Sequence, residues 1–265
     1  MTLSQLVIIA LIQGITEFLP VSSSGHLILI PNLTGWRDQG LVIDVAVHVG
    51  TLAAVIVFLW RDIWSMPRRG VGQKNTSRNA GLRLLGQMLI ATLPLVIVGA
   101  LVYRYAGNTL RDPAVVGWAT LGFGGLLYLA DKYTITINRL EHMTWGRALI
   151  IGCAQIFALI PGASRAGTTI TMARWLGFER VDAARFSMLL SIPAIIAAGA
   201  AATLDLLESG SEQVVFEAVA AGVMAFVAAF AAMIFLIKWL RRATFAPFVI
   251  YRVVLAVVIL AWVYS

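Results

Sequence analysis

Six apolar stretches, each close to 20 residues long, constrain this 265-residue chain more than any other feature. A helix needs roughly 20 apolar residues to cross a hydrocarbon core of about 30 Å. The stretches cover about residues 41–60, 84–103, 114–130, 183–204, 215–237 and 247–264. Charged residues make up only 12% of the chain, against about 25% in soluble domains. We therefore expect an all-α integral membrane protein with six full transmembrane helices, forming one polytopic domain over residues 1–265.

Two further apolar regions are interrupted. Residues 3–35 contain Pro20 followed by Ser22 to Gly25, and residues 147–176 contain Pro161 followed by a glycine-rich segment. A break in a helix is tolerated at membrane depth only where the freed backbone groups face protein or a water-filled cavity. We predict two broken re-entrant helical hairpins whose turns point into the protein.

The distribution of basic residues predicts the topology. Most of the 20 lysines and arginines lie in residues 61–83, 131–147, 174–185 and 238–242, which the positive-inside rule assigns to the cytoplasm. The first hairpin must then enter from outside and the second from inside. Because three spans follow each hairpin, residues 1–130 and 147–264 are expected to form an inverted-topology repeat. The net charge of +7 belongs to alternate loops, so we expect no nucleic-acid partner.

The two interrupted segments can be aligned with each other. Pro20-Val-Ser-Ser-Ser-Gly over Pro161-Gly-Ala-Ser-Arg-Ala places Ser23 over Ser164 and Ser24 over Arg165. In folds built from inverted repeats, such segments meet near the bilayer midplane, where helix N-termini favour an anion. The sequence therefore predicts a site between the two hairpins.

The side chains of the two segments are chemically complementary. The first offers a carboxylate, three hydroxyls and an imidazole, and the second offers hydroxyls and a guanidinium: Glu17, Ser22, Ser23, Ser24 and His26, with Ser164, Arg165, Thr168 and Thr169. Arginine, hydroxyls and turn amides suit phosphoryl oxygens. A carboxylate beside phosphate is favourable when a divalent cation such as magnesium or calcium lies between them. The pattern indicates a metal-assisted phosphate site with Glu17 as metal ligand.

The motifs resemble those of the undecaprenyl-diphosphate phosphatases, the integral-membrane phosphatases associated with bacitracin resistance. The resemblance is carried by Gln13 to His26, Asp44 to Thr51, Pro161 to Thr169 and Pro247 to Arg252. It implies hydrolysis of undecaprenyl diphosphate to the monophosphate, with a divalent metal, to recycle the lipid carrier of peptidoglycan. Two positions depart from the usual pattern. Gln13 is the uncharged variant of a carboxylate, and Ala166 replaces a serine.

The resemblance also implies the roles of individual residues. We expect four catalytic residues, Glu17, Ser23, His26 and Arg165. We expect the substrate to contact Gln13, Ser22, Ser24, Ser164, Arg165 and Thr168. The sequence leaves open whether Ser23, His26 or a water molecule attacks phosphorus, and a covalent intermediate on either side chain is compatible with it.

His48 and Arg252 are ionisable residues that lie in apolar spans. We expect His48 to be structural, with its imidazole satisfied by a backbone carbonyl, and we leave it out of the catalytic set. Arg252 lies near the start of the last span, where it could extend to the interface or point inward.

The expected location is the bacterial cytoplasmic (inner) membrane, with the site facing the periplasm or the exterior. The expected partners are a polyprenyl diphosphate lipid and membrane lipids, and bacitracin would act through the substrate. A homodimer is left open. The rival interpretation is a secondary transporter or flippase for an anionic substrate, since inverted repeats with broken helices are typical of transporters.

Overall fold

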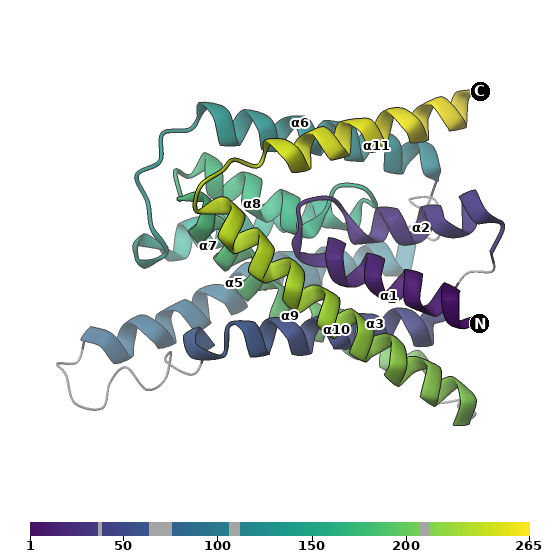
Figure 1. The fold of residues 1–265 in the computed structure, drawn as a ribbon. Coiled ribbons are helices and arrows are strands. Elements are labelled where there is room, and N and C mark those ends of the chain that lie inside the picture. Colours follow the sequence, from purple (N-terminus) through teal and green to yellow (C-terminus); the bar gives the residue numbers. More distant parts are fainter. Residues whose placement is uncertain (37–38, 64–75, 106–111, 207–211) are drawn as a thin grey trace.

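The computed structural model describes residues 1–36, 39–63, 76–105, 112–206 and 212–265, and its fold is helical (Figure 1). The α-helices are α1 (Leu3–Phe18), α2 (Ser23–Thr34), α3 (Gly40–Phe58), α5 (Thr76–Tyr105), α6 (Pro113–Tyr133), α7 (Trp145–Gln155), α8 (Arg165–Trp175), α9 (Arg180–Leu206), α10 (Glu212–Leu240) and α11 (Ala246–Tyr264). The short 3-10 helices are η2 (Leu140–His142) and η3 (Ile156–Leu159). Within the described ranges no strand forms.

Six of these helices are long and apolar enough to cross a membrane: α3, α5, α6, α9, α10 and α11. They coincide with the six predicted spans, although α5 and α10 extend several residues beyond them. Many large apolar side chains on these helices are exposed, as lipid-facing residues are. The prediction of an all-α membrane protein with six full spans is therefore confirmed.

Both predicted breaks are present. Helix α1 ends at Phe18 and α2 begins at Ser23, whereas α7 continues through η3 and α8 begins at Arg165. The two hairpins turn in opposite directions, and their turns lie toward each other in the middle of the molecule (Figure 1). This arrangement is compatible with two re-entrant hairpins of opposite orientation.

Each half-helix begins with a serine cap of the same unusual geometry. Ser22 and Ser164 have positive φ angles of 74° and 71°. The hydroxyl of Ser22 accepts a hydrogen bond from the Gly25 N–H, and that of Ser164 accepts one from the Gly167 N–H. Such capping satisfies N–H groups that have no partner within the helix.

These caps correct the predicted alignment of the two breaks by one residue. Ser22 corresponds to Ser164, so Ser23 corresponds to Arg165. The alignment by proline was wrong because the second turn is one residue longer between its proline and its cap. That turn also contains Gly162, whose φ of 95° favours glycine.

The helices pack in pairs that repeat between the two halves. Helix α1 packs against α10 and α7 packs against α5, while α3 contacts α9 and α6 contacts α11. Glycines permit the first two contacts: a Cβ at Gly14 would lie 2.6 Å from the Ala225 carbonyl oxygen, and one at Gly152 would collide with Ala91. Small residues allow this close approach of helices in membranes. The packing is compatible with the predicted inverted repeat.

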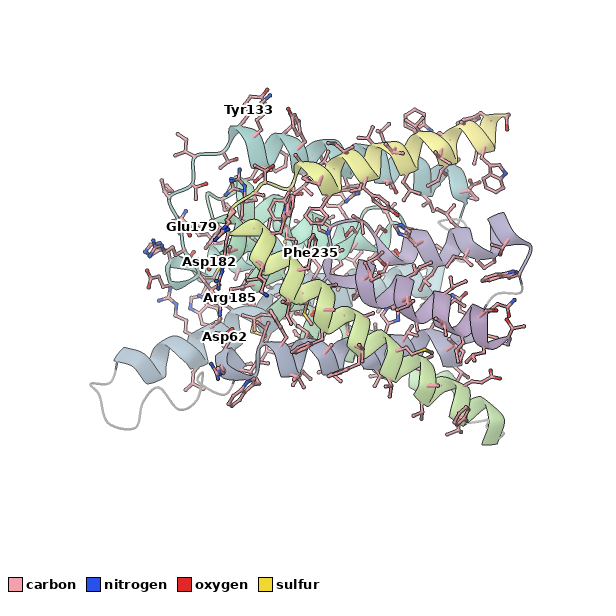
Figure 2. The ribbon with its side chains drawn as sticks, viewed as in Figure 1. Asp62, Tyr133, Glu179, Asp182, Arg185 and Phe235 are labelled. Carbon is pink, nitrogen blue, oxygen red and sulfur yellow. The ribbon has the colours of Figure 1, made fainter. Side chains whose placement is uncertain are left out.

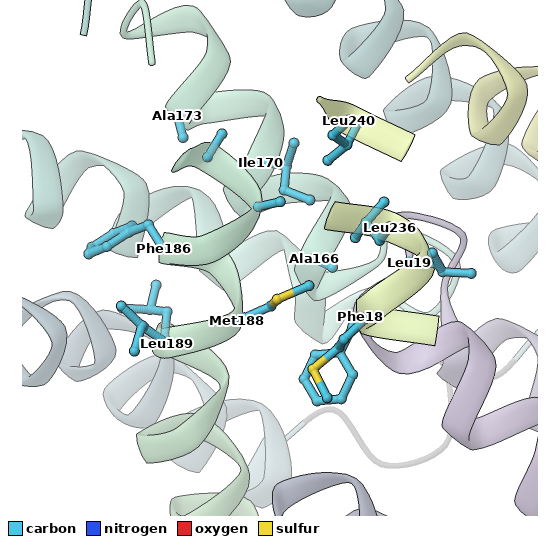
Figure 3. Close-up of a cluster of buried hydrophobic side chains, with 14 of the residues drawn as sticks. Phe18, Leu19, Ala166, Ile170, Ala173, Phe186, Met188, Leu189, Leu236 and Leu240 are labelled. Carbon is cyan, nitrogen blue, oxygen red and sulfur yellow. The ribbon is translucent and has the colours of Figure 1, made fainter. Parts of the chain in front are cut away.

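A cluster of buried apolar side chains holds the first turn against the second half. Figure 3 shows that it joins the end of α1 to α8, α9 and α10 through Phe18, Leu19, Ala166, Ile170, Met188 and Leu236, among others. Dense packing of this kind fixes the position of the turns. The hairpins are therefore held in place by the full helices around them.

One end of the molecule, here called the basic end, carries the connections at residues 59–63, 134–144, 176–179 and 241–245 (Figure 1). Asp62, Glu179, Asp182 and Arg185 lie there (Figure 2). Both Asp62 oxygens accept from one nitrogen of Arg185, at 2.9 and 2.7 Å. The N- and C-termini lie at the opposite end. Of the basic residues in the four predicted cytoplasmic segments, Arg68, Arg69 and Lys74 fall outside the described residues.

Candidate active site

A cavity of about 350 Å³, here called the central cavity, lies between the two hairpins and helices α3, α5 and α9. Its polar lining residues are Glu17, Ser23, Ser24, Asp44, His48, Ser164 and Arg165. The rest of its wall is apolar and is formed by residues of α3, α5, η3 and α9: Leu41, Val45, Leu95, Ala158, Leu159, Ala194, Ile195, Ala198 and Gly199. A concave, mostly apolar site with a few convergent polar groups is typical of a ligand-binding site.

The carboxylate of Glu17 is the centre of the polar region. Its Oε2 accepts hydrogen bonds from the Ser23 hydroxyl at 2.7 Å and from Nε2 of Gln13 at 2.9 Å. Its Oε1 accepts one from Nη2 of Arg165 at 3.2 Å. Gln13 lies one turn before Glu17 on α1, whereas Ser23 and Arg165 are the first residues of α2 and α8. The two breaks thus bring a hydroxyl and a guanidinium to one carboxylate.

Arg165 is held from two sides. Its Nη1 donates to the Ser187 carbonyl oxygen at 3.2 Å while Nη2 faces Glu17. The Arg165 side chain is only 13% exposed and that of Glu17 only 7%. A buried charge without its partner is strongly unfavourable, so the two side chains compensate each other's charge.

His48 faces the same carboxylate from α3. Its Nδ1 lies 2.7 Å from the Asp44 carbonyl oxygen, which confirms the expected backbone partner. However, its Nε2 lies 4.0 Å from Oε2 of Glu17, and both His48 and Asp44 line the central cavity. The site predicted from the sequence did not contain these two residues. Their spacing of four residues within an apolar span was the available signal, because it puts both on one helix face.

The ring nitrogens of His26 face the first turn and α11. Its Nδ1 lies 2.6 Å from the Ser22 carbonyl oxygen and its Nε2 lies 2.6 Å from the hydroxyl of Tyr251. The two rings are stacked, with an interplanar angle of 9°. A carbonyl can only accept, so Nδ1 carries the proton in the neutral ring and Nε2 accepts from Tyr251. His26 is not among the residues that line the central cavity.

Arg252 connects the two turns. It is completely buried and donates to the Pro20 carbonyl of the first turn and to the Gly162 and Ala163 carbonyls of the second. Its Nε donates to the Thr120 carbonyl on α6 at 3.1 Å. The side chain therefore points inward. It satisfies carbonyl groups that the broken helices leave without partners, as buried polar groups require.

The family can be assigned from the whole sequence. The model of the family described as "Bacitracin resistance protein BacA" matches residues 6–258. The chain belongs to the BacA family.

Curated relatives of this BacA-family chain match over its full length. It is 48% identical over 272 residues to undecaprenyl-diphosphatase 1 of Rhodospirillum rubrum, covering all of this chain and 96% of that protein. It is 47% identical over 270 residues to undecaprenyl-diphosphatase of Ruegeria pomeroyi, and 45% identical over 271 residues to that of Roseobacter denitrificans, with both chains fully covered in each case. The predicted family resemblance is confirmed.

The other predicted binding residues of this BacA-family protein differ in position. Ser24 and Ser164 line the central cavity. Ser22 and Thr168 do not line it; the Ser22 hydroxyl caps α2, and the Thr168 hydroxyl donates to the Arg165 carbonyl. Ala166, the departure from the family pattern, is 2% exposed and belongs to the apolar cluster of Figure 3. The alanine there fits a packing role.

The donor set of the central cavity fits one kind of metal site. Among the described residues, no group of three or more His, Cys, Asp or Glu side chains could enclose a cation. Two carboxylates, Glu17 and Asp44, line the cavity, and Glu17 uses three of its roughly four acceptor positions. Magnesium commonly binds through one or two carboxylates together with substrate phosphates. The residues fit a cation of that type and do not form a complete protein cage.

Proposed function

We propose that this protein hydrolyses undecaprenyl diphosphate to undecaprenyl phosphate and inorganic phosphate, and so recycles the lipid carrier of peptidoglycan and other cell-envelope glycans. The main support for this proposal is that the Ser23 hydroxyl and the Arg165 guanidinium both contact the carboxylate of Glu17 in one cavity. The names of the relatives from Rhodospirillum and Ruegeria support the same substrate.

The lining of the central cavity suits an amphipathic lipid phosphate. In the proposal, the diphosphate binds at the polar end, where Arg165 and the hydroxyls of Ser24 and Ser164 are available donors. The prenyl chain follows the apolar wall formed by α3, α5 and α9. A volume of about 350 Å³ is too small for a C55 chain, so most of the chain would remain among the lipids.

Ser23 is the nucleophile in this proposal. Its hydroxyl donates to Glu17 at 2.7 Å, so Glu17 is positioned to take the proton as the oxygen attacks the terminal phosphorus. An Oγ–P bond forms and the bridging P–O bond breaks, and its electron pair leaves with undecaprenyl phosphate. Water then cleaves the phosphoserine to release phosphate and restore the hydroxyl. Arg165 binds the phosphoryl oxygens and balances their charge.

Glu17 and Asp44 are the residues that would hold a divalent cation, magnesium or calcium. Such a cation, when bound, would neutralise the diphosphate charge and make the terminal phosphorus more electrophilic. Gln13 keeps the Glu17 carboxylate in place by its 2.9 Å hydrogen bond, which is a polar and indirect role.

His26 supports the site through the turn in this proposal. Its contacts with the Ser22 carbonyl and with Tyr251 fix the residue immediately before Ser23. We therefore assign it a positioning role for the nucleophile. The sequence-based expectation placed His26 in the catalytic set and left open whether it attacks phosphorus.

The proposal is tested by phosphate release from a prenyl diphosphate, measured on the purified full-length protein in detergent. We expect release that requires a divalent cation, stops with chelator and is abolished by Glu17→Ala. Thr171→Val is the matched control, because Thr171 lies on α8 and its hydroxyl donates to the Gly167 carbonyl outside the central cavity. Absence of release, together with flux of the lipid in liposomes, would favour the transporter or flippase instead.

The same proposal places the protein in the bacterial inner membrane with the central cavity open to the periplasm or exterior. The cavity is lined by the first turns of α3 and by residues toward the end of α9, which lie at the end opposite to the basic end. The positive-inside rule makes that end external. Labelling of Ser24→Cys from each side, in a Cys153→Ala background because Cys153 is exposed, checks the assignment. Labelling only from the cytoplasmic side would reverse it.

A further inference from the structure

A second cavity, here called the basic-end cavity, lies at the basic end of the molecule. It has a volume of about 240 Å³ and is lined by the end of α6, by Arg180 at the start of α9 and by residues 244–246 and 249 at the start of α11. It shares no lining residue with the central cavity. It is therefore a separate cavity from that of the proposed phosphatase site.

Cationic side chains outnumber carboxylates around this cavity. Arg174 and Arg180 both donate to Oδ1 of Asp131, at 3.1 and 2.7 Å, and the Phe245 N–H donates to Oδ2 at 3.1 Å. Asp131 is 7% exposed and Arg174 is 2% exposed. Lys132 and Arg180 are the two cations of the lining, which does not include Arg174. One fully engaged carboxylate thus balances only part of the positive charge.

The nearby acidic residues do not remove this excess. Glu179 pairs with Arg139 at 3.1 Å, and Asp182 accepts the Leu140 N–H at 2.9 Å. Neither lines the cavity. The electrostatic field at the cavity therefore favours an anion.

Uncharged hydrogen-bond donors and the start of a helix add to the preference of this cavity for an anion. The hydroxyls of Tyr128 and Thr244 belong to lining residues, and Nζ of Lys132 lies 3.0 Å from the Tyr128 hydroxyl. Helix α11 begins at Ala246 on the cavity wall and is 19 residues long. The N-terminal end of a helix carries partial positive charge, and α11 contributes this dipole rather than free N–H donors, because the Ala246 N–H bonds to the Thr244 hydroxyl and Pro247 has no N–H.

The position of the cavity identifies the class of anion. It lies at the ends of two membrane-spanning helices, α6 and α11. Tyr128 and Tyr133 mark this end of α6, and the next turns of α11 expose Ile250, Val254 and Val257. Tyrosines are enriched at the membrane–water interface, and basic pockets between helices on the cytoplasmic side bind phospholipid headgroups.

We propose that the basic-end cavity binds the phosphodiester headgroup of an anionic phospholipid in the leaflet next to the basic end. The phosphate lies near Lys132, Arg180 and the first turn of α11. The acyl chains lie along the exposed apolar face of α11. The volume of 240 Å³ suits a headgroup without its acyl chains.

The test measures lipid binding to the purified full-length protein in detergent by native mass spectrometry. The probes are a short-chain phosphatidylglycerol, the matching phosphatidylcholine and inorganic phosphate. We expect saturable binding of phosphatidylglycerol that is stronger than binding of phosphatidylcholine. Lys132→Gln, at an exposed residue, should weaken it about fivefold, as expected for loss of one cationic contact with a headgroup.

Arg242→Gln is the matched control, because Arg242 is an exposed cation of the basic end that does not line the cavity. The affinity of the Arg242→Gln variant for phosphatidylglycerol should equal that of the wild type. Equal weakening by both variants, or no weakening by Lys132→Gln, would overturn the proposal. If inorganic phosphate binds as tightly as the lipid and this binding depends on Lys132, the ligand of the cavity is free phosphate and not a lipid headgroup, and the proposal is overturned. Because no phosphate release is measured, the result is independent of the proposed hydrolysis.

Discussion

Nη2 of Arg165 lies 3.2 Å from Oε1 of Glu17, although 148 residues separate them in the chain. Glu17 belongs to the first hairpin and Arg165 to the second, so neither half of the chain contains the site alone. The contact also brings Ser23, bound to the other oxygen of Glu17, into the same cavity.

Ser23→Ala should lower the rate of phosphate release by at least about 10³-fold, because it removes the proposed nucleophile. The rate is measured in single-turnover experiments with a prenyl diphosphate. Rapid acid quenching of the wild type should trap phosphate on Ser23, detectable by mass spectrometry. A Ser23→Ala protein with wild-type rates would exclude Ser23 as the nucleophile and leave water as the attacking group.

Glu17→Gln and Arg165→Gln should each lower stability by up to about 3–5 kcal/mol, since each leaves a buried charge without its partner. The double variant should lose less than the sum of the two single losses, because it removes both charges. Thermal unfolding of the detergent-purified proteins measures this coupling. Additive losses would show that the two side chains do not interact in solution.

Arg252→Lys should lower thermal stability and activity together. A lysine keeps the charge but cannot reproduce the four hydrogen bonds to carbonyl oxygens of both turns and α6. Hydrogen bonds to charged groups contribute about 1.5–3 kcal/mol each. The free energy of unfolding should therefore fall by more than the contribution of one such bond. Arg241→Lys, at an exposed residue, is the control and should change neither property. An Arg252→Lys protein as stable as the control would contradict the role in joining the turns.

Tyr251→Phe should lower kcat by less than about tenfold, because it removes one hydrogen bond that orients His26. His26→Asn should retain more activity than Ser23→Ala, since asparagine can still donate to the Ser22 carbonyl. Steady-state kinetics with a prenyl diphosphate separate kcat from KM. If His26→Asn is as inactive as Ser23→Ala while its stability is unchanged, His26 takes part in the chemistry directly.

Gly152→Val should destabilise the protein by about 1–3 kcal/mol, as overpacking of a well-packed contact does. The new Cβ would collide with the backbone of Ala91 where α7 meets α5. Gly125→Ala on α6 is the control, because a Cβ there meets nothing within 4 Å. Thermal unfolding compares the two. A melting temperature for Gly152→Val equal to that of the control would show that α5 and α7 can separate without cost.

The sequence was most informative about elements with a strong local cause. Hydropathy predicted the six spans, because a spanning helix must be apolar over a fixed length. Pro20 and Pro161, with the serines and glycines that follow, predicted where the hairpins break. The types of polar residue at the breaks also predicted that Glu17, Ser23 and Arg165 belong to one site, and they are in contact.

The sequence was less informative about the orientation of side chains. A shift of one residue turns a helix position by about 100°, so the alignment of Ser23 with Ser164 assigned the wrong pairs. The caps correct it, because Ser22 and Ser164 share a positive φ that no sequence pattern of this chain specifies. For the same reason, the sequence could not tell that Thr168 bonds within its own helix while Ser24 lines the central cavity.

The sequence by itself determined that this chain is a membrane protein with six spans and two broken segments, since local composition is sufficient to specify them. It also determined the family, through long motifs in both halves. Only the tertiary structure decided that His48 faces Glu17, that His26 faces Tyr251 and that Arg252 joins the two turns. The physical reason is that these partners lie 31 to 232 residues apart, and packing of the helices brings them together.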